Sequence, residues 1–239
     1  MMKPTIYLFV WAICLPLVCQ AQKWGEKINT LRAQLTPHVT HAVYDSLHFI
    51  ITEHYLQVTA EERSKIRDSL KKHAHWSTEK LCTDTEKGEK IIISGRVVDE
   101  QNKPIPTVQL AIFQADNNGY YAPSDSVSKK MSENDPRLFG FITTDKSGNY
   151  LFQTIRPASY PIQYNGRTIP QHIHINTNAV GYNARAIQMV FERDPAMNES
   201  YWQDWARKQN YPVVRLTIGK DKRLFGAYDL VLTRVGQGK

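Results

Sequence analysis

The chain has few cysteines and no cluster of like charges, and each absence excludes a class of protein. Of its 239 residues only three are cysteine, and two of these, Cys14 and Cys19, fall in or beside an N-terminal segment that we expect to be removed. The mature chain then keeps only Cys82, which excludes an internal disulfide even in an oxidising compartment. The 30 basic and 23 acidic side chains give a formal net charge of +7, but they are scattered along the chain. A Lys/Arg-rich run of the kind that follows phosphates is missing, so we expect no nucleic-acid partner.

The first 21 residues have the pattern of a secretory signal peptide. Lys3 supplies the positive end, residues 6–18 are apolar, and residues 19–21 (Cys-Gln-Ala) fit a small-residue cleavage site. The apolar stretch is too short to span a bilayer. We therefore expect cleavage after Ala21 and a periplasmic or secreted protein. Lipidation at Cys19, which would hold the protein on a membrane, is the less favoured alternative, because Val18 is larger than the residue that normally precedes a lipidated cysteine.

Residues 22–87 are predicted to form a helical region. Apolar side chains recur three and four residues apart, as in Val43, Leu47 and Ile50, which is the period of an amphipathic helix. Thr59 and Glu62 have the spacing of a capping box, in which each side chain binds the backbone N–H of the other residue. The region carries no catalytic constellation. We expect it to serve in packing, or in a homo-oligomer contact.

From residue 88 the apolar period changes to two, which is the period of a strand. Turn-forming residues separate these short segments, for example Asp145-Lys-Ser-Gly148. Many short strands with regular turns are typical of two packed sheets. We therefore predict a mainly β domain over residues 88–235, an antiparallel β-sandwich with a transthyretin-like core and an N-terminal helical appendage. The predicted strands cover residues 91–98, 108–115, 139–144, 150–155, 172–176, 186–191, 213–218 and 225–233.

Two histidines one residue apart are the clearest chemical signal. On a strand, His172 and His174 would point to the same face, because successive side chains alternate. Tyr121 and Tyr160 stand upstream in turn-rich contexts. Imidazole alone suits zinc, copper or iron, whereas two imidazoles with two phenolates form a hard, anionic set that suits ferric iron.

These residues lie in segments that resemble a known family. The segments resemble those of the intradiol ring-cleavage dioxygenases and occur in the same order. The likeness is nearest to the protocatechuate 3,4-dioxygenase type. The likeness covers residues 88–191, with a looser tail to residue 233, and the N-terminal helices lie outside it. The segments that carry it are residues 88–106, 113–121, 139–150, 154–161, 170–174 and 188–195.

The resemblance implies an enzyme and a ligand set. By this likeness Tyr121, Tyr160, His172 and His174 bind Fe(III), and Tyr160 is released when the substrate chelates the metal. Tyr120 competes with Tyr121, and alignment on Gln114-Ala-Asp favours Tyr121. The implied reaction opens a catechol ring between its two hydroxyls with O2 and gives a cis,cis-muconate-type diacid. The expected partners are therefore a small catechol-type substrate and O2.

The chain departs from the family pattern beside the first histidine. The family usually has an arginine three residues before it, and Ile169 takes that place here. Arg167, two residues earlier, is a candidate to replace it and is predicted to be catalytic; the alternative is a surface arginine in a turn. Gln188 sits where the family places a glutamine close to the metal, and we predict that role for it.

Two other functions remain open at this point. Strand–turn units such as residues 95–106 also occur in transthyretin-like modules that bind without catalysis. The histidine pair also suits a zinc hydrolase. That enzyme would need a carboxylate base near the metal, and the nearest candidates in the sequence are Glu192 and Asp194.

Overall fold

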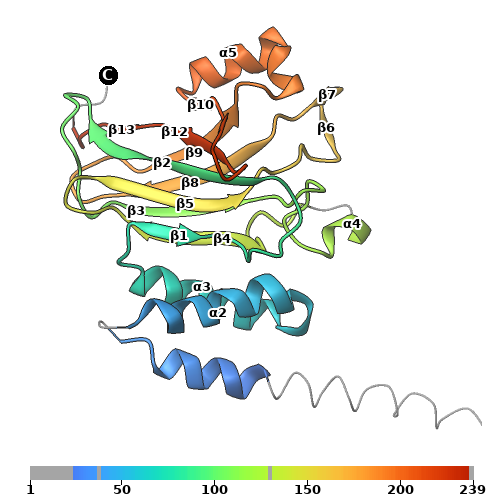
Figure 1. Ribbon diagram of the computed structural model, residues 1–239, viewed down its shortest axis with the longest axis vertical. Helices are drawn as coiled ribbons and strands as arrows, with labels where there is room; N and C mark the ends of the chain where they lie inside the picture. Colours follow the sequence, from blue (N-terminus) through green and yellow to red (C-terminus); the bar gives the residue numbers. More distant parts are fainter. Residues whose placement is uncertain (1–23, 37–38, 129–130, 237–239) are drawn as a thin grey trace, which may run out of the picture. The chain divides into compact units, whose positions relative to one another are not determined.

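The computed structural model describes residues 24–36, 39–128 and 131–236, and the chain divides into two compact units, residues 1–73 and 74–239 (Figure 1). The predicted signal peptide, residues 1–21 with Cys14 and Cys19, lies outside the described residues. Within the described ranges, no helix is both long enough and apolar enough to cross a membrane.

The first unit is helical, as its apolar spacing predicts. Leu47, Ile51, Ile66 and Leu70 are buried within it. The predicted capping box is confirmed: the backbone N of Glu62 donates to Thr59 Oγ1 at 3.2 Å, and the backbone N of Thr59 donates to Glu62 Oε2 at 3.1 Å. The helices cover residues 24–33, α2 (His41–His54), η1 (Tyr55–Gln57) and α3 (Ala60–His73).

The second unit is mainly β and holds two larger sheets and one short hairpin (Figure 1). The first sheet has the order β1-β5-β2-β12-β11, and β13 also pairs with β2. Its strands are β1 (Thr78–Lys80), β2 (Lys90–Asp99), β5 (Asn149–Ile155), β11 (Thr217–Ile218), β12 (Leu224–Ala227) and β13 (Leu230–Leu232).

The second sheet has the order β10-β9-β8-β3-β4. Short helices and a hairpin complete the unit: α4 (Asp125–Ser128), β6 (Gln163–Tyr164) with β7 (Arg167–Thr168), η2 (Pro195–Asn198) and α5 (Ser200–Lys208). The strands of the second sheet are β3 (Gln109–Gln114), β4 (Leu138–Thr143), β8 (His172–Asn178), β9 (Arg185–Phe191) and β10 (Val213–Val214).

The prediction of purely antiparallel pairing is wrong. The pairs β2–β5, β3–β4, β3–β8 and β8–β9 are antiparallel, but β1–β5, β9–β10, β2–β12 and β2–β13 are parallel, so both sheets are mixed. The reason is that alternation along a strand indicates which face is buried, and says nothing of the direction of the partner strand.

One hydrophobic cluster takes side chains from both sheets. Ile93 and Phe152 enter it from the first sheet, and Ile112 and Ile175 from the second; each is at most 1 % exposed. The second unit also begins earlier than the predicted boundary between residues 87 and 88. The difference arises because β1 pairs with β5, which ties residues 78–80 to the first sheet.

Candidate metal centre

The two histidines lie on one face of β8, as the strand period predicts. In register with β9, His172 is opposite Val190 and His174 is opposite Gln188. The residues between and after them, Ile173 and Ile175, point the other way and join the cluster between the two sheets. The imidazoles are therefore on the outer face of the second sheet, away from that cluster.

Tyr121 follows β3 through a tight turn organised by Asp116. The Asp116 carboxylate accepts the backbone N–H groups of Asn118 and Tyr120 at 2.8 and 3.1 Å. The Asp116 carbonyl accepts the backbone N–H of Ala158 at 3.0 Å. This last bond joins the Tyr121 turn to the loop that follows β5 and carries Tyr160.

Gly119 lets these two segments approach closely. Its φ is +82°, in the left-handed region that favours glycine, and a Cβ there would lie 2.2 Å from the carbonyl oxygen of Ser159. The backbone beside Tyr120 thus lies directly against the backbone beside Tyr160. A sequence pattern of Asn-Asn-Gly indicates a turn, but the contact across it comes from the fold.

Four donor atoms meet at this place. Tyr121 Oη is 2.7 Å from His174 Nε2, and Tyr160 Oη is 2.8 Å from His172 Nε2. The two Nε2 atoms are 3.1 Å apart, Tyr160 Oη is 3.4 Å from His174 Nε2, and the two tyrosine hydroxyls are in contact. The structure thus brings all four predicted ligands together, and Tyr121 rather than Tyr120 contributes the hydroxyl.

The histidine side chains are oriented for metal binding. His172 Nδ1 lies 2.7 Å from the carbonyl oxygen of Pro170, so Nδ1 carries the proton and Nε2 presents a lone pair to the cluster. His174 is stacked on Phe113, its register partner on β3, with ring centroids 4.5 Å apart. Burial lowers the pKa of His172, and burial together with His172 lowers the pKa of His174 to about 3, so both rings are neutral at pH 7.

The tyrosines need a cation to become phenolates. Burial raises the pKa of both Tyr121 and Tyr160 well above the usual range, and the charge of Glu133 adds to the rise. A metal ion among the four donors would reverse this preference, because a nearby positive charge favours the phenolate. Two neutral imidazoles and two ionisable phenols thus fit a ferric ion as a donor set.

One side chain beside the tyrosines was not predicted from the sequence. Met131 packs against the cluster that contains Tyr121 and Tyr160. Ser132, the next residue, is held by Asp125, whose buried carboxylate accepts hydrogen bonds from Ser132 N and Oγ at 3.0 and 2.6 Å. A single methionine in a polar stretch gives no periodic signal from which this contact could be predicted.

Three other predicted positions have different outcomes. Gln188 lies next to His174 on the same face, as its register on β9 requires. Arg167 does not join the four donors: its guanidinium is 3.6 Å from Glu199 Oε2 and lies over the Tyr201 ring. Ile169, at the place of the family arginine, packs against Tyr121 and Tyr160. The cluster therefore has an apolar side chain where the family pattern has a cation.

The carboxylates that a zinc hydrolase would need are occupied elsewhere. Glu192 pairs with Arg215 at 2.7 Å, and Asp194 accepts backbone N–H groups from Gln171 and Ala196. Across the described ranges, no group of three or more His, Cys, Asp and Glu side chains is placed to hold a metal ion. Burial raises the pKa of the Cys82 thiol to about 11, so it stays protonated at pH 7.

Comparison with known proteins assigns the family. A family model described as Dioxygenase matches residues 68–233, well over half of the chain. The chain belongs to the intradiol ring-cleavage dioxygenase family. The match includes all four residues of the tyrosine–histidine cluster.

The relatives of known sequence are dioxygenases. The chain is 32% identical over 142 residues to the protocatechuate 3,4-dioxygenase beta chain of Burkholderia cepacia, covering 58% of this chain and 57% of the relative. It is 31% identical over 123 residues to the catechol 1,2-dioxygenase of Candida albicans, covering 46% and 39%. The chain thus spans about half the length of these curated relatives.

Solved structures give the same fold. The 3-chlorocatechol 1,2-dioxygenase of Rhodococcus opacus 1CP superposes with a TM-score of 0.52 at 23% identity, over 68% of this chain and 67% of that one. The dioxygenase domain of a dioxygenase carbohydrate-binding protein fusion from Streptomyces sp. SirexAA-E superposes with a TM-score of 0.51 at 25% identity, over 68% and 90%.

Proposed function

We propose that this protein is an Fe(III)-dependent intradiol dioxygenase on a β-sandwich, which uses O2 to open a catechol ring between its hydroxyls and releases a cis,cis-muconate-type diacid. The observation that carries the proposal is the convergence of two tyrosine Oη atoms and two histidine Nε2 atoms on one face of the second sheet. Membership of the intradiol family supports it.

Tyr121, Tyr160, His172 and His174 would hold the iron. A bound ferric ion supplies the Lewis acidity and the redox capacity that cleavage of a catechol by O2 requires. The protein fixes the two imidazoles before any metal arrives. The Pro170 carbonyl holds the His172 ring, and the Phe113 stack holds the His174 ring.

We assign proton transfer to Tyr160. It is 9 % exposed whereas Tyr121 is 1 % exposed, so Tyr160 is the tyrosine that an entering diol reaches first. As a phenolate, its Oη can accept the proton of a catechol hydroxyl, which leaves Tyr121 and the two histidines as the permanent holders of the site. Gln188, which is opposite His174 on the same face, would donate a hydrogen bond to the substrate or to O2.

Three of the neighbours of the two tyrosines are apolar. Phe113, Met131 and Ile169 pack beside them, and such surfaces would favour a flat aromatic ring. The relatives bear the names of protocatechuate, catechol and hydroxyquinol dioxygenases, so these three compounds, each with two adjacent ring hydroxyls, are the substrates to test.

Two neighbouring tyrosines provide a matched test of the proposal. Tyr121→Phe removes one oxygen from the cluster and keeps the ring, and we expect O2 uptake by the iron-loaded protein to fall by roughly a hundredfold or more. Tyr120→Phe removes the same atom one residue away, and we expect uptake to stay within about twofold. An iron-loaded wild-type protein that consumes no O2 with any of the three diols would overturn the proposal, as would an equal loss in both variants.

We also propose that the protein is exported after cleavage behind Ala21. The support is the signal-like order of residues 1–21. The intact mass of protein recovered from the expressing cell tests this, because removal of 21 residues and lipidation at Cys19 give different masses. A full-length chain in the cytoplasm would contradict it.

A further inference from the structure

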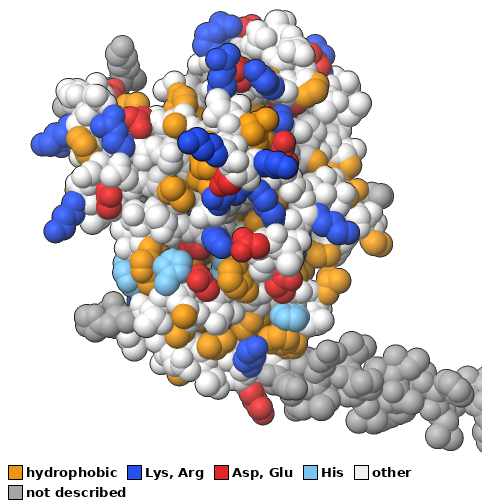
Figure 2. Space-filling view, in the orientation of Figure 1, with side chains coloured by type: hydrophobic (Ala, Val, Ile, Leu, Met, Phe, Trp, Pro, Cys, Tyr) orange, Lys and Arg blue, Asp and Glu red, His pale blue; other side chains and the backbone are white. Residues whose placement is uncertain are grey.

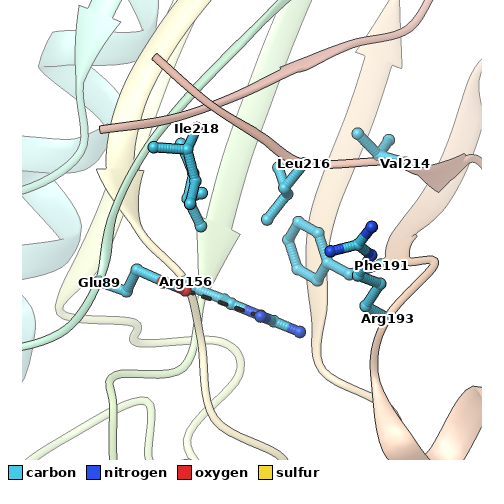
Figure 3. Close-up of a pocket in the computed structure, with 8 residues that line it drawn as sticks. Glu89, Arg156, Phe191, Arg193, Val214, Leu216 and Ile218 are labelled. Atoms are coloured by element: carbon cyan, nitrogen blue, oxygen red, sulfur yellow. Dashed lines mark ion pairs between the residues drawn. The ribbon is translucent and has the colours of Figure 1, made fainter. Parts of the chain in front are cut away.

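A second cavity opens at one end of the hydrophobic cluster between the two sheets (Figure 3). Its volume is about 190 Å³. Five of the lining side chains are apolar and three are charged. They are Phe191, Val214, Leu216, Ile218, Leu224, Glu89, Arg156 and Arg193.

The cavity is separate from the tyrosine–histidine cluster. Phe191 belongs to the hydrophobic cluster between the sheets, whereas its neighbour Val190 is opposite His172 on the outer face. Because side chains alternate along β9, the ring of Phe191 points to the other side of the sheet from the two histidines. A ligand in this cavity would therefore not touch the four donor atoms.

The two arginines of the cavity are bound very differently. Arg156 is partly buried: its Nε donates to Gln171 Oε1 at 2.7 Å, and its Nη1 is 3.6 Å from Glu89 Oε2 (dashed in Figure 3). Its guanidinium also lies over the Phe191 ring, 5.6 Å from the centroid. Arg193 is exposed and has no hydrogen bond or ion pair with any described residue.

The lack of a partner for Arg193 stands out among nearby arginines. Arg215 pairs with Glu192, and Arg223 pairs with Asp221. The lining holds two guanidinium groups and one carboxylate, that of Glu89, so the cavity carries an excess positive charge. In the view of Figure 2, Lys and Arg side chains lie on the surface near the β10 and β12 strands, with Asp and Glu side chains among them. The excess positive charge of the lining favours an anionic ligand.

We propose that this cavity binds a small carboxylate with a flat, unsaturated body. Its size suits one ring, since an apolar cavity of about 150 Å³ is enough to bind benzene. The body would lie against Phe191 and Leu216, where apolar surface is available. The carboxylate would remain at the mouth, where Arg193 offers a planar pair of N–H donors that match its two oxygens.

Two sources can present this chemistry, an aromatic acid or a ring-opened unsaturated diacid. Calorimetric titration of the full chain with benzoate and with cis,cis-muconate tests both, and benzyl alcohol is the neutral control. We expect saturable binding of at least one acid and none of the alcohol, because the charge of the ligand is what Arg193 recognises. The acid that binds more tightly identifies the source.

Arg193→Gln is the decisive variant. It removes the charge from an exposed side chain that holds nothing else in place, and we expect it to weaken the bound acid by about tenfold. Arg215→Gln is the matched control: it removes a neighbouring arginine that does not line the cavity, and binding should not change. Arg156 is left intact because it also holds Gln171, the residue before His172.

A further variant separates this site from the tyrosine–histidine cluster, where a carboxylate can bind a metal ion. Binding that survives His174→Ala and is weakened by Arg193→Gln supports the proposal. Binding that is lost in His174→Ala and unchanged in Arg193→Gln overturns it. The absence of binding of either acid to the wild-type protein at millimolar concentration overturns it as well.

Discussion

Alternate residues of strand β8 point to two faces of the sheet, and the two faces have different roles. On the inner face, Ile173 and Ile175 are fully buried and belong to the hydrophobic cluster between the sheets. On the outer face, His172 and His174 meet two tyrosine hydroxyls. The period of two therefore lets one strand stabilise the fold with one set of side chains and hold a reactive site with the other. Substitutions on the two faces should have separable effects.

The outer face also depends on parts that are not in the sheet. Tyr121 and Tyr160 come from loops after β3 and β5, and these loops are joined through Asp116 and the close approach at Gly119. The histidines are thus placed by the strand register, whereas the tyrosines are placed by two turns. Substitutions in the turns should therefore disturb the site without removing any of its donor atoms.

The largest effect is expected on the outer face. His174→Ala removes one donor atom, so we expect iron content and O2 uptake to fall by roughly a hundredfold or more. The unfolding free energy of the metal-free protein should fall by only about 1 kcal/mol, from the lost stack on Phe113. Metal analysis, O2 uptake and urea unfolding of one preparation measure the three quantities. Normal iron content would contradict the assignment of His174.

Ile175, the residue after His174, should affect stability and not iron binding. Ile175→Ala removes three carbons from a fully buried position and should lower the unfolding free energy by about 2–5 kcal/mol. Iron content per folded molecule should stay near the wild-type value. A loss of iron without a loss of stability would show that the two faces are not separable.

The turns are tested by two glycines with the same backbone angle. Gly119 and Gly181 both have φ +82°, but a Cβ at Gly181 would meet no atom within 4 Å. Gly181→Ala should therefore lower the unfolding free energy by only about 1 kcal/mol, the cost of a left-handed backbone for alanine, and should leave iron affinity unchanged. Gly119→Ala should lower the unfolding free energy by more than this, because the added methyl group displaces the Tyr160 loop. Iron affinity should fall as well. Equal losses of stability and of iron affinity in the two variants would contradict this account of the turn.

The neutral histidines predict a pH dependence of the metal-free protein. The pKa of His174 is about 3 in the folded chain and about 6.5 in the unfolded chain, so between these values only the unfolded chain takes up the proton. Stability should therefore fall as the pH falls below 6.5, by about 2 kcal/mol at pH 5 for His174 alone. Urea unfolding at pH 7 and pH 5 measures this. In His174→Ala the unfolding free energy should change less between these two pH values. A change as large as that of the wild-type protein would show that His174 is not its cause.

The smallest effect is expected at Arg167. Its guanidinium is held by Glu199 and Tyr201, away from the four donor atoms. Arg167→Gln should leave the turnover number within about twofold and lower stability by less than about 1 kcal/mol, as exposed ion pairs do. A fall in kcat of tenfold or more, with unchanged KM and unchanged folding, would show that Arg167 has the catalytic role predicted from the sequence.

The sequence predicted the residues of the cluster better than their surroundings. The strand period placed both histidines on one face, and the resemblance selected Tyr121 and Tyr160. The parallel pairs and strand β1 were not predicted, because the period of a strand does not specify its partner. The packing of Met131 and Ile169 on the tyrosines, and the turn of Arg167 toward Glu199, depend on contacts between distant segments that no local pattern encodes.

The most direct test of the central claim is the visible absorption spectrum of the purified, iron-reconstituted protein, before and after anaerobic addition of catechol. Tyrosine phenolates bound to ferric iron absorb visible light by charge transfer. The account predicts a red-brown protein whose absorption band shifts when catechol is added. A protein that remains colourless and holds no iron after ferric reconstitution would contradict it.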